Sequence, residues 1–232
     1  MKNPYLKLSK DRDKRKHYYL MLDTETANTL EDPFVYDLGL AVTDKKGNIY
    51  HSESLIIEDV FFGYNWLMET AYYSEKIPLY YEMLKTGYSK LVSYKTAKFK
   101  VRDICKAWDI KAIVSHNGRF DYRSTATTQR RLTNSKYRYF LPYGIPLWCT
   151  MRMAESTICK MKGYINWCNE LPEERITKNG QVRKTAEILY QFITDNDDFI
   201  EEHTGMEDAI IEAQIMAYCF KQKKKMRKLT FA

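Results

Sequence analysis

The sequence predicts an α/β fold: a mixed sheet of five strands, three of them antiparallel and the others parallel, with helices on both faces. Short apolar runs of strand length alternate with segments whose apolar residues recur at helical spacing. The first three runs are joined by short turns, as in an antiparallel meander. The later runs follow helical segments, from which crossover connections can return to the sheet. At 232 residues the chain fits one large domain, or a domain with an insertion.

The strands are expected where apolar residues form short runs bounded by turns. Residues 18–22 are continuously apolar, which is typical of a buried strand. The polar turn at residues 45–48 separates two further runs, as a turn between two antiparallel strands does. After the first strand, the expected strands cover residues 34–43, 49–57, 110–115 and 145–150.

The helices are expected where apolar residues lie three or four positions apart. In the last of them, Met206 and Ala209 begin an apolar stripe that continues for three turns. Before it, residues 161–182 are expected to form a surface excursion, because Pro172 and Gly180 are turn-forming residues. The expected helices cover residues 75–86, 98–108, 119–131, 151–160, 184–194 and 205–222.

Positive charge is concentrated at the two ends of the chain. Residues 1–17 carry seven Lys or Arg and two Asp, and residues 221–232 carry six Lys or Arg and no acid. The ends therefore hold a net +11 in a chain whose total is +7. We divide the chain into a basic N-terminal segment (1–17), a main domain (18–220) and a basic C-terminal tail (221–232). Basic segments around an acidic body suit a polyanion that must approach carboxylates. A solvated helix end is the alternative for the tail.

Several classes of protein are disfavoured by the sequence. No apolar stretch approaches the length of a membrane span, and the N-terminus lacks the apolar core of a signal peptide. Five cysteines without paired short spacings argue against a disulfide framework or a structural zinc site. We therefore expect a cytoplasmic protein with no membrane partner.

Two carboxylates follow the first apolar run. Asp23 and Glu25 are two positions apart, so on a strand both side chains point to the same face. Two acids at the end of a buried strand are costly unless a cation neutralises them. Oxygen ligands favour Mg²⁺ or Mn²⁺ over soft metals. Taken alone, such a pair is more often a solvated strand end.

Two more clusters of polar residues follow other expected strands and helices. After the strand at 110–115 come His116 and Asn117, with Asp121 four residues on, in what is expected to be the first turn of a helix. Asp208 lies beside the apolar stripe of the last helix, and His203 precedes it by five residues. Each of these residues has an ordinary explanation, such as a helix cap, a first-turn acid or a loop histidine. Together, and in this order, they indicate a metal-dependent nuclease site.

The three clusters resemble the three motifs of the DEDDh 3′→5′ exonucleases. The matching residues are Asp23 to Thr26, His116-Asn117 with Phe120-Asp121, and His203 with Asp208-Ala209. This family includes the proofreading subunit of bacterial DNA polymerase III and small exoribonucleases. Residues 71–78 and 135–144 are more similar to stand-alone exonucleases encoded by phages. One departure is that Ala27-Asn28 stands where many members have Thr-Gly, which affects contacts to the terminal nucleotide rather than the acids.

The resemblance implies a ribonuclease H-like exonuclease fold and two-metal phosphodiester hydrolysis. Two Mg²⁺ or Mn²⁺ ions would be held by the catalytic acids, and His203 would be the general base. Since five helical steps would turn His203 away from Asp208, the histidine is expected on the loop before the helix. The implied metal ligands are Asp23, Glu25, Asp121 and Asp208, and the implied nucleic-acid contacts are Thr24, Thr26, His116, Asn117 and Phe120.

The expected partners are single-stranded or frayed 3′ ends, with DNA favoured and nucleoside 5′-monophosphates as products. Replication or repair proteins are further candidate partners, and the oligomeric state is open. Two other functions remain at this stage: an exoribonuclease with the same chemistry, and a non-catalytic nucleic-acid-binding module that keeps the fold. The intact set of acids argues against the second.

Overall fold

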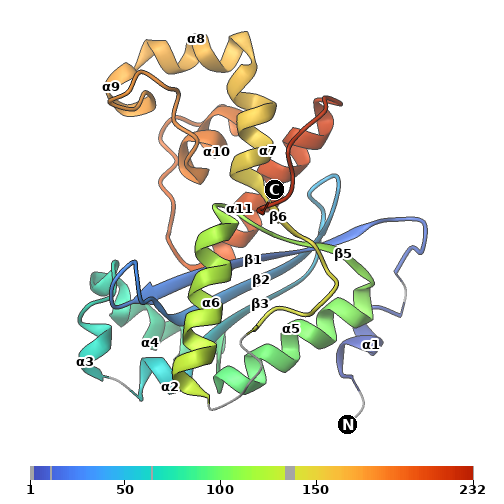
Figure 1. Cartoon of the computed structure of the whole chain (residues 1–232), viewed down its shortest axis with the longest axis vertical. Helices are drawn as coiled ribbons and strands as arrows, with labels where there is room; N and C mark the ends of the chain where they lie inside the picture. The colour runs from blue at the N-terminus through green and yellow to red at the C-terminus, as the bar shows by residue number, and fades with distance from the viewer. Residues whose placement is uncertain (1–2, 11, 64, 134–138, 232) are drawn as a thin grey trace.

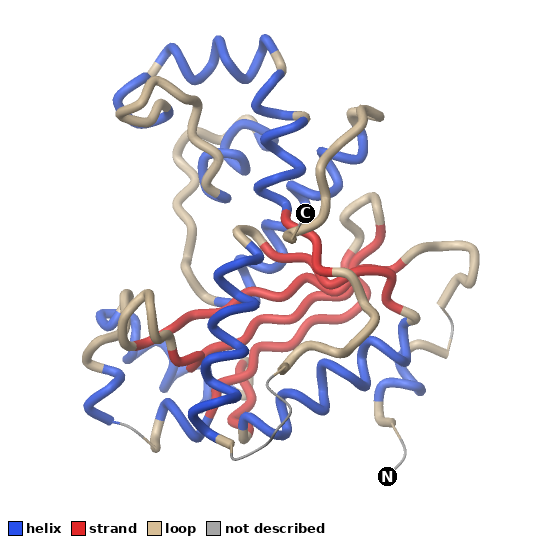
Figure 2. Tube along the Cα trace, in the orientation of Figure 1, coloured by secondary structure: helices blue, strands red, loops and turns tan. Residues whose placement is uncertain are grey.

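The computed structural model describes residues 3–10, 12–63, 65–133 and 139–231. Six strands form one mixed sheet in the order β4-β3-β2-β1-β5-β6 (Figures 1 and 2). The first three strands are antiparallel neighbours, whereas β4, β5 and β6 each run parallel to their partners. The strands are β1 (Tyr18–Ala27), β2 (Phe34–Asp44), β3 (Ile49–Ile57), β4 (Ser89–Val92), β5 (Ile110–Ser115) and β6 (Leu147–Cys149).

The number of strands corrects the sequence-based prediction, which gave five. The additional strand, β4, has four residues and lies at the edge of the sheet, where it runs parallel to the end of β3. Its middle residues, Lys90 and Leu91, are exposed, so the segment lacks the apolar run of a buried strand. Its buried residue is Ser89, whose hydroxyl lies 2.7 Å from that of Ser54 on β3.

Each expected helix has an observed counterpart, with ends displaced by a few residues. Several short helices were not anticipated, and residues 161–182, expected as an excursion, contain two of them, α8 and α9. With α7 and α10 they form a group at the top of Figure 1, in which α7 continues directly from β6. The helices are α1 (Tyr5–Leu8), α2 (Glu58–Phe61), α3 (Asn65–Met68), η1 (Ser74–Lys76), α4 (Ile77–Thr86), α5 (Tyr94–Trp108), α6 (Gly118–Leu132), α7 (Thr150–Ser156), η2 (Ile158–Lys160), α8 (Lys162–Glu170), α9 (Pro172–Arg175), α10 (Ala186–Thr194) and α11 (Gly205–Lys221).

The sheet has a hydrophobic core on each face. On β1, Leu20 and Leu22 belong to the core that α5 completes, whereas Tyr19 and Met21 belong to the core formed with α7, α10 and α11. Because side chains alternate along a strand, the odd-numbered positions of β1 all face α11. Continuing this series along the strand places the next odd-numbered side chains, beginning with Asp23, on the α11 side of the sheet.

The start of α11 lies directly against β2, at two glycines. A Cβ atom added to Gly39 would lie 1.8 Å from the carbonyl carbon of Gly205, and one added to Gly205 would lie 2.6 Å from the amide nitrogen of Gly39. A side chain at either position would therefore hold helix and strand apart. In addition, the Gly205 amide donates a 2.9 Å hydrogen bond to the buried Asp37 carboxylate on β2.

Both ends of the described chain pack onto the domain. Tyr5 of α1 is 3% exposed and donates hydrogen bonds to Glu53 on β3. In the tail, the Thr230 amide donates to the Leu147 carbonyl, and Cys149 donates to the carbonyl of Lys228. The tail therefore lies alongside β6 and extends the edge of the sheet. None of the helices in the described ranges combines the length and apolar character that a membrane span needs.

Part of the phage-like stretch at 135–144 lies outside the described residues, as do a few positions of the two basic ends. The unplaced positions are 1–2, 11, 64, 134–138 and 232.

Candidate active site

Three of the carboxylates expected to bind metal meet on the α11 side of the sheet. One oxygen from each of Asp23, Glu25 and Asp208 lies within 4.8 Å of the others. The first two come from the end of β1, and the third comes from the first turn of α11. Residues 23 and 25 share a face because they are two apart, and the register of β1 with β2 shifts only after Glu25.

Asp208 reaches the strand because α11 starts in contact with β2. Its amide donates to the Thr204 carbonyl, which begins the helix, and the close approach at Gly205 brings this first turn against the sheet. Asp208 is 5% exposed, and its Oδ1 atom has no hydrogen-bond partner among the described residues. A buried carboxylate oxygen without a donor is destabilising unless a cation is bound.

Asp121 approaches from the other direction. It is buried in the first turn of α6, and its Oδ1 accepts a 3.0 Å hydrogen bond from Thr24, whose side chain alternates with those of Asp23 and Glu25. The other oxygen of Asp121 has no hydrogen-bond partner in the described part of the chain. Asp121 therefore lies beside the three-carboxylate group rather than within it. The Thr24 hydroxyl orients this acid, and the expected contact of Thr24 with nucleic acid stays a prediction.

Glu212 is a further acid beside the group, one turn after Asp208 and buried. It is 1% exposed, and its Oε1 accepts a 2.8 Å hydrogen bond from the amide of His116, while Oε2 is left without a donor from the described residues. The ring nitrogens of His116 lie 2.8 Å from the Thr150 hydroxyl and 2.8 Å from the Lys184 carbonyl oxygen. Burial lowers the pKa of His116 to about 4, so this imidazole is neutral. Its expected contact with nucleic acid stays a prediction.

The crowded acids raise one another's pKa values. For Asp23 the largest cause is burial, followed by the charges of Glu212 and Asp121. Burial is likewise the first cause of the raised pKa of Asp208, followed by Glu201 and Glu25. Removing a proton from any of these groups places another negative charge in a poorly solvated cluster. The site therefore favours protons or metal cations over bare carboxylates.

His203 lies in the loop that precedes α11, as expected from its distance to Asp208. Its backbone adopts the left-handed conformation, with φ at 52°. The ring stacks on Tyr73, and Nδ1 lies 3.8 Å from a carboxylate oxygen of Glu201. Burial, and then the charge of Lys76, lower the pKa of this imidazole, which favours the neutral form that can accept a proton.

Two more of the expected site residues line an open hollow beside α6. Asn117 and Phe120 line a cavity of about 420 Å³ together with Arg119, Arg123 and Phe231 of the tail. The Arg123 guanidinium lies 5.8 Å from the centre of the Phe120 ring. An aromatic ring beside arginines is suited to an unpaired base and its phosphate.

The loop after β1 bears on the departure from the motif that the sequence resembles. Asn28, which stands where many DEDDh exonucleases have glycine, has a φ of 72°, a conformation that asparagine tolerates better than most residues. Its amide donates to the Thr70 hydroxyl. The backbone thus keeps the shape that glycine permits. Thr26, two residues earlier, lies just beyond the register shift of β1, and its expected role in binding stays a prediction.

Four contributors to the site were not recognised from the sequence, although two of them, Glu212 and Gly39, left a trace in it. Glu212 is four residues after Asp208, the spacing of side chains on one helical face. Asp37 holds the start of α11, and Gly39, a glycine inside an apolar strand, is the usual mark of a close backbone contact. Tyr73 had no such mark and is identified only by its stacking on His203.

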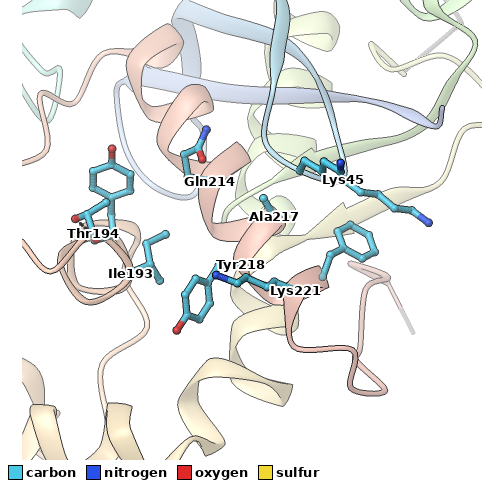
Figure 3. Close-up of a pocket in the computed structure, with 10 residues that line it drawn as sticks. Lys45, Ile193, Thr194, Gln214, Ala217, Tyr218 and Lys221 are labelled. Atoms are coloured by element: carbon cyan, nitrogen blue, oxygen red, sulfur yellow. Dashed lines mark hydrogen bonds between the residues drawn. The ribbon is translucent and has the colours of Figure 1, made fainter. Parts of the chain in front are cut away.

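A cavity larger than the hollow beside Phe120 lies elsewhere in the described structure. It encloses about 690 Å³ between α10, α11 and the β2–β3 turn, and none of the predicted site residues lines it (Figure 3).

Comparison with known proteins identifies the fold but no family. No protein-family model matches the sequence, and no curated protein is significantly similar to it. The crystal structure of a full-length 3′-exonuclease matches 92% of this chain with a TM-score of 0.54 and 14% identity. Cell-death related nuclease 4 matches 92% with a TM-score of 0.53 and 11% identity. The chain spans 63% and 67% of the lengths of these two proteins. At such identities the likeness establishes a shared fold.

Proposed function

We propose that this chain is a metal-dependent 3′→5′ exonuclease of the DEDDh type. It would hydrolyse phosphodiester bonds at single-stranded or frayed 3′ ends, with DNA favoured, and release nucleoside 5′-monophosphates. The observation that carries the proposal is the meeting of Asp23, Glu25 and Asp208 within 4.8 Å, although 182 residues lie between the second and the third. The shared fold with a 3′-exonuclease and a nuclease supports it.

The donor atoms suit Mg²⁺ or Mn²⁺. All the candidate ligands are carboxylate oxygens, the atoms that hard divalent cations prefer. Buried oxygens of Asp121, Asp208 and Glu212 lack hydrogen-bond donors among the described residues, so a cation would satisfy atoms that the protein leaves unpaired. Asp23, Glu25 and Asp208 would hold the ions, with Asp121 supporting the second. The bound ions would supply charge stabilisation to the attacking and leaving oxygens.

The chain's own residues would handle the proton and the substrate. His203 is neutral and half-exposed at the edge of the acid cluster, so it can accept the proton of the attacking water. Phe120 would pack against the terminal bases, while Arg119 and Arg123 would bind the phosphates that follow. An unpaired end fits this arrangement, because the rings and arginines of the hollow can bind the bases and phosphates of a single strand.

Cleavage of end-labelled oligonucleotides tests the proposal. A 5′-labelled single-stranded DNA should give a ladder that shortens from the 3′ end with Mg²⁺ or Mn²⁺, and no products in EDTA. Asp208→Asn should bind the DNA but cleave it at least about 100-fold more slowly, since an amide is a poor substitute for a charged ligand. Cleavage that begins at the 5′ end, or that survives chelation, would refute the proposal.

The same assay separates the two alternatives. A matched RNA cleaved faster than the DNA would identify an exoribonuclease that uses the same acids. Binding of both without cleavage, under every metal condition, would identify a non-catalytic binding module. The carboxylate cluster argues against that module, because binding a phosphate backbone needs no group of buried acids.

A further inference from the structure

Basic hollows continue from the candidate active site over the C-terminal tail. The hollow beside Phe120 shares Asn117 and Arg119 with a second one of about 270 Å³, which extends to Arg152 and Arg227. These two arginines also line a third hollow, of about 370 Å³, with Trp148. Because consecutive hollows share side chains, they form one continuous surface.

Lys228 connects this surface to the large cavity at the far end of α11. Its ammonium nitrogen lies 4.9 Å from the centre of the Trp148 ring and 5.2 Å from that of Phe220. Trp148 lines the third hollow, and Phe220 lines the cavity of about 690 Å³. The connection therefore consists of two aromatic rings with a cation over both.

The large cavity is basic and aromatic (Figure 3). Lys45 and Lys46 enter it from the β2–β3 turn and Lys221 from α11, with the rings of Tyr190 and Tyr218 between them. None of its ten lining residues is acidic. Among the described residues, no carboxylate pairs with any of these three lysines, whose side chains are exposed. Three unpaired ammonium groups around one cavity attract a polyanion.

The turn that carries Lys45 and Lys46 is fixed in place. Gly47 has a φ of 82°, and a Cβ atom there would lie 2.9 Å from the side-chain oxygen of Gln214 on α11. The Gln214 amide group donates a 2.9 Å hydrogen bond to the Gly47 carbonyl. The two lysines are thus held against the helix before any ligand binds, which lowers the entropic cost of binding.

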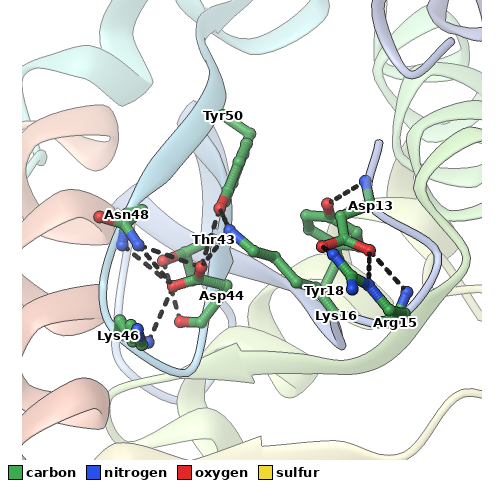
Figure 4. Close-up of polar contacts among 9 residues, drawn as sticks. All are labelled: Asp13, Arg15, Lys16, Tyr18, Thr43, Asp44, Lys46, Asn48 and Tyr50. Atoms are coloured by element: carbon green, nitrogen blue, oxygen red, sulfur yellow. Dashed lines mark hydrogen bonds and ion pairs between the residues drawn. The ribbon is translucent and has the colours of Figure 1, made fainter. Parts of the chain in front are cut away.

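The acids along this surface are already paired. Asp44 borders a further hollow with Lys16, Lys45 and Lys46, and its carboxylate accepts hydrogen bonds from Lys16 and from the turn itself (Figure 4). Glu155 borders the second hollow and pairs with Lys184 and Arg227. Neither carboxylate is left to repel a phosphate backbone.

We infer that this surface is an extended binding path for the 5′-ward part of a single-stranded nucleic acid, with Lys45, Lys46 and Lys221 at its distal end. The inference rests on the proposed exonuclease function, since the 3′ end of the strand would lie at the acid cluster. Alternating rings and cations match the bases and phosphates of a single strand, whereas an acidic protein would not require the rings. We name it the distal path, defined by Arg152, Arg227, Lys228, Lys45, Lys46 and Lys221.

The distal end of the path, at Lys45, Lys46 and Lys221, is too far from the acids to be reached by a very short strand. Asp208 and Lys221 are separated along α11 by thirteen residues, or about 20 Å. At about 3.4 Å per stacked nucleotide, a strand needs roughly six nucleotides to cover that distance. An oligomer of about four nucleotides should therefore occupy the acid cluster alone, whereas one of about twenty should occupy both regions.

Charge reversal at the β2–β3 turn tests the inference. Lys45→Glu with Lys46→Glu should weaken binding of a DNA of about twenty nucleotides at least tenfold, measured by fluorescence anisotropy in EDTA. The salt slope should also become flatter by roughly 0.7 for each lost contact. Hydrolysis of an oligomer of about four nucleotides should be unchanged. The control, Lys95→Glu with Lys106→Glu, changes two exposed lysines of α5 on the opposite face of the sheet.

Two results would overturn the distal path: unchanged binding of the long DNA by the turn variant, or an equal loss in the α5 control. A melting curve for each variant shows whether it folds. Failure of the exonuclease proposal is distinguishable, because it would appear as absent hydrolysis of the short oligomer by the unmodified protein. The length-dependent binding in EDTA would still be measured.

Discussion

The imidazole of His203 lies flat against the ring of Tyr73, with the ring centres 4.2 Å apart and the planes inclined by 13°. Two residues that are distant in the sequence therefore fix the orientation of the proposed general base. Lys76, three residues after Tyr73 at the end of η1, donates a hydrogen bond to the Glu202 carbonyl and so holds the loop that carries His203. The proposed general base, His203, is therefore oriented by residues around η1 that do not belong to its own motif.

Removing this stack should affect turnover more than binding. His203→Ala should lower kcat by about 10²–10⁴-fold, the usual contribution of a general base. Tyr73→Ala should lower kcat about tenfold with little change in KM, because the imidazole loses its orientation while the phosphate contacts remain. Tyr73→Phe, which keeps the ring, should restore kcat. Steady-state kinetics of the three variants checks this, and a loss in Tyr73→Phe equal to that in Tyr73→Ala would contradict it.

Divalent cations should stabilise the folded chain. Metal that binds only the folded state adds about 2.7 kcal/mol to the free energy of unfolding at a hundredfold excess over Kd. For a chain of this size the melting temperature should rise by roughly 5–10 °C. Asp208→Asn should lose most of that rise. A melting temperature that does not respond to millimolar Mn²⁺ would show that the carboxylates do not form a metal site.

The metal-free protein should become less stable as the pH rises from 6.5 to 8. Burial is the largest cause of the raised pKa values of Glu25, about 8, and Asp208, about 9. An unfolded carboxyl group titrates near 4, so in this range the unfolded chain has lost protons that the folded chain keeps, and stability falls with pH. His116, with its pKa lowered to about 4, acts oppositely but only below about 6.5.

Thermal melts in EDTA across this pH range check the direction. We expect a fall of several degrees, since one group that differs in protonation contributes about 1.4 kcal/mol per pH unit. Saturating Mn²⁺ should abolish the fall, because the bound cation takes the place of the protons. A melting temperature that rises with pH in EDTA would mean that the acids are not crowded in solution.

Glu212→Gln should separate metal binding from folding. The substitution removes one negative charge next to Asp23 and keeps an acceptor for the His116 amide. The metal-free protein should therefore become more stable, while the affinity for Mn²⁺ falls by about 10–100-fold, as for outer ligands of metal sites. Calorimetric titration with Mn²⁺ measures the affinity. Glu202→Gln, at an exposed acid in the loop before α11, is the control and should change neither quantity.

Gly39→Ala should disrupt the site without touching an acid. The new methyl group would lie 1.8 Å from the Gly205 carbonyl carbon, so α11 must move away from β2. We expect a loss of about 3 kcal/mol or more in the free energy of unfolding, with weaker Mn²⁺ binding. Gly163→Ala on α8, where a Cβ meets nothing within 4 Å, should be neutral or slightly stabilising. Equal stability of the two variants in urea would contradict the contact.

The role of the basic tail should be tested by charge reversal rather than by deletion of residues 221–232. Its Lys and Arg residues point to a free basic extension that could be deleted at no cost to the fold. In the structure Thr230 is buried and its amide pairs with β6, so deletion would remove part of the sheet edge together with the charges. Charge reversal at single exposed positions is therefore the informative change.

The strands and helices of the main domain could be predicted because hydrophobic periodicity records which face is buried. Residues 110–115 were assigned as a strand and are the strand β5. The edge strand β4 was missed because half of its side chains face solvent. The helices α8 and α9, within residues 162–175, were missed because turn-forming residues lie in and next to these short helices. Periodicity carries no information about elements that bury little surface.

The sequence predicted which residues form the candidate site, but it did not predict how they lie relative to one another. Asp23 and Glu25 share a face by strand geometry, but nothing in the sequence alone places Asp208 beside them. That distance depends on the contact between Gly39 and Gly205, which is a tertiary relationship. Tyr73 was missed for the same reason, since a stacking partner leaves no local pattern.

The docking of α11 on β2 also determines when, during synthesis of the chain, the carboxylate group is completed. Ribosomes add about 5–20 residues per second, so Asp208 is made roughly 10–40 s after Asp23. Until the helix reaches the strand, the emerging chain holds two acids without their third partner. A nascent chain would therefore lack the complete carboxylate group, and the three acids could hold a metal together only when the last helix has folded.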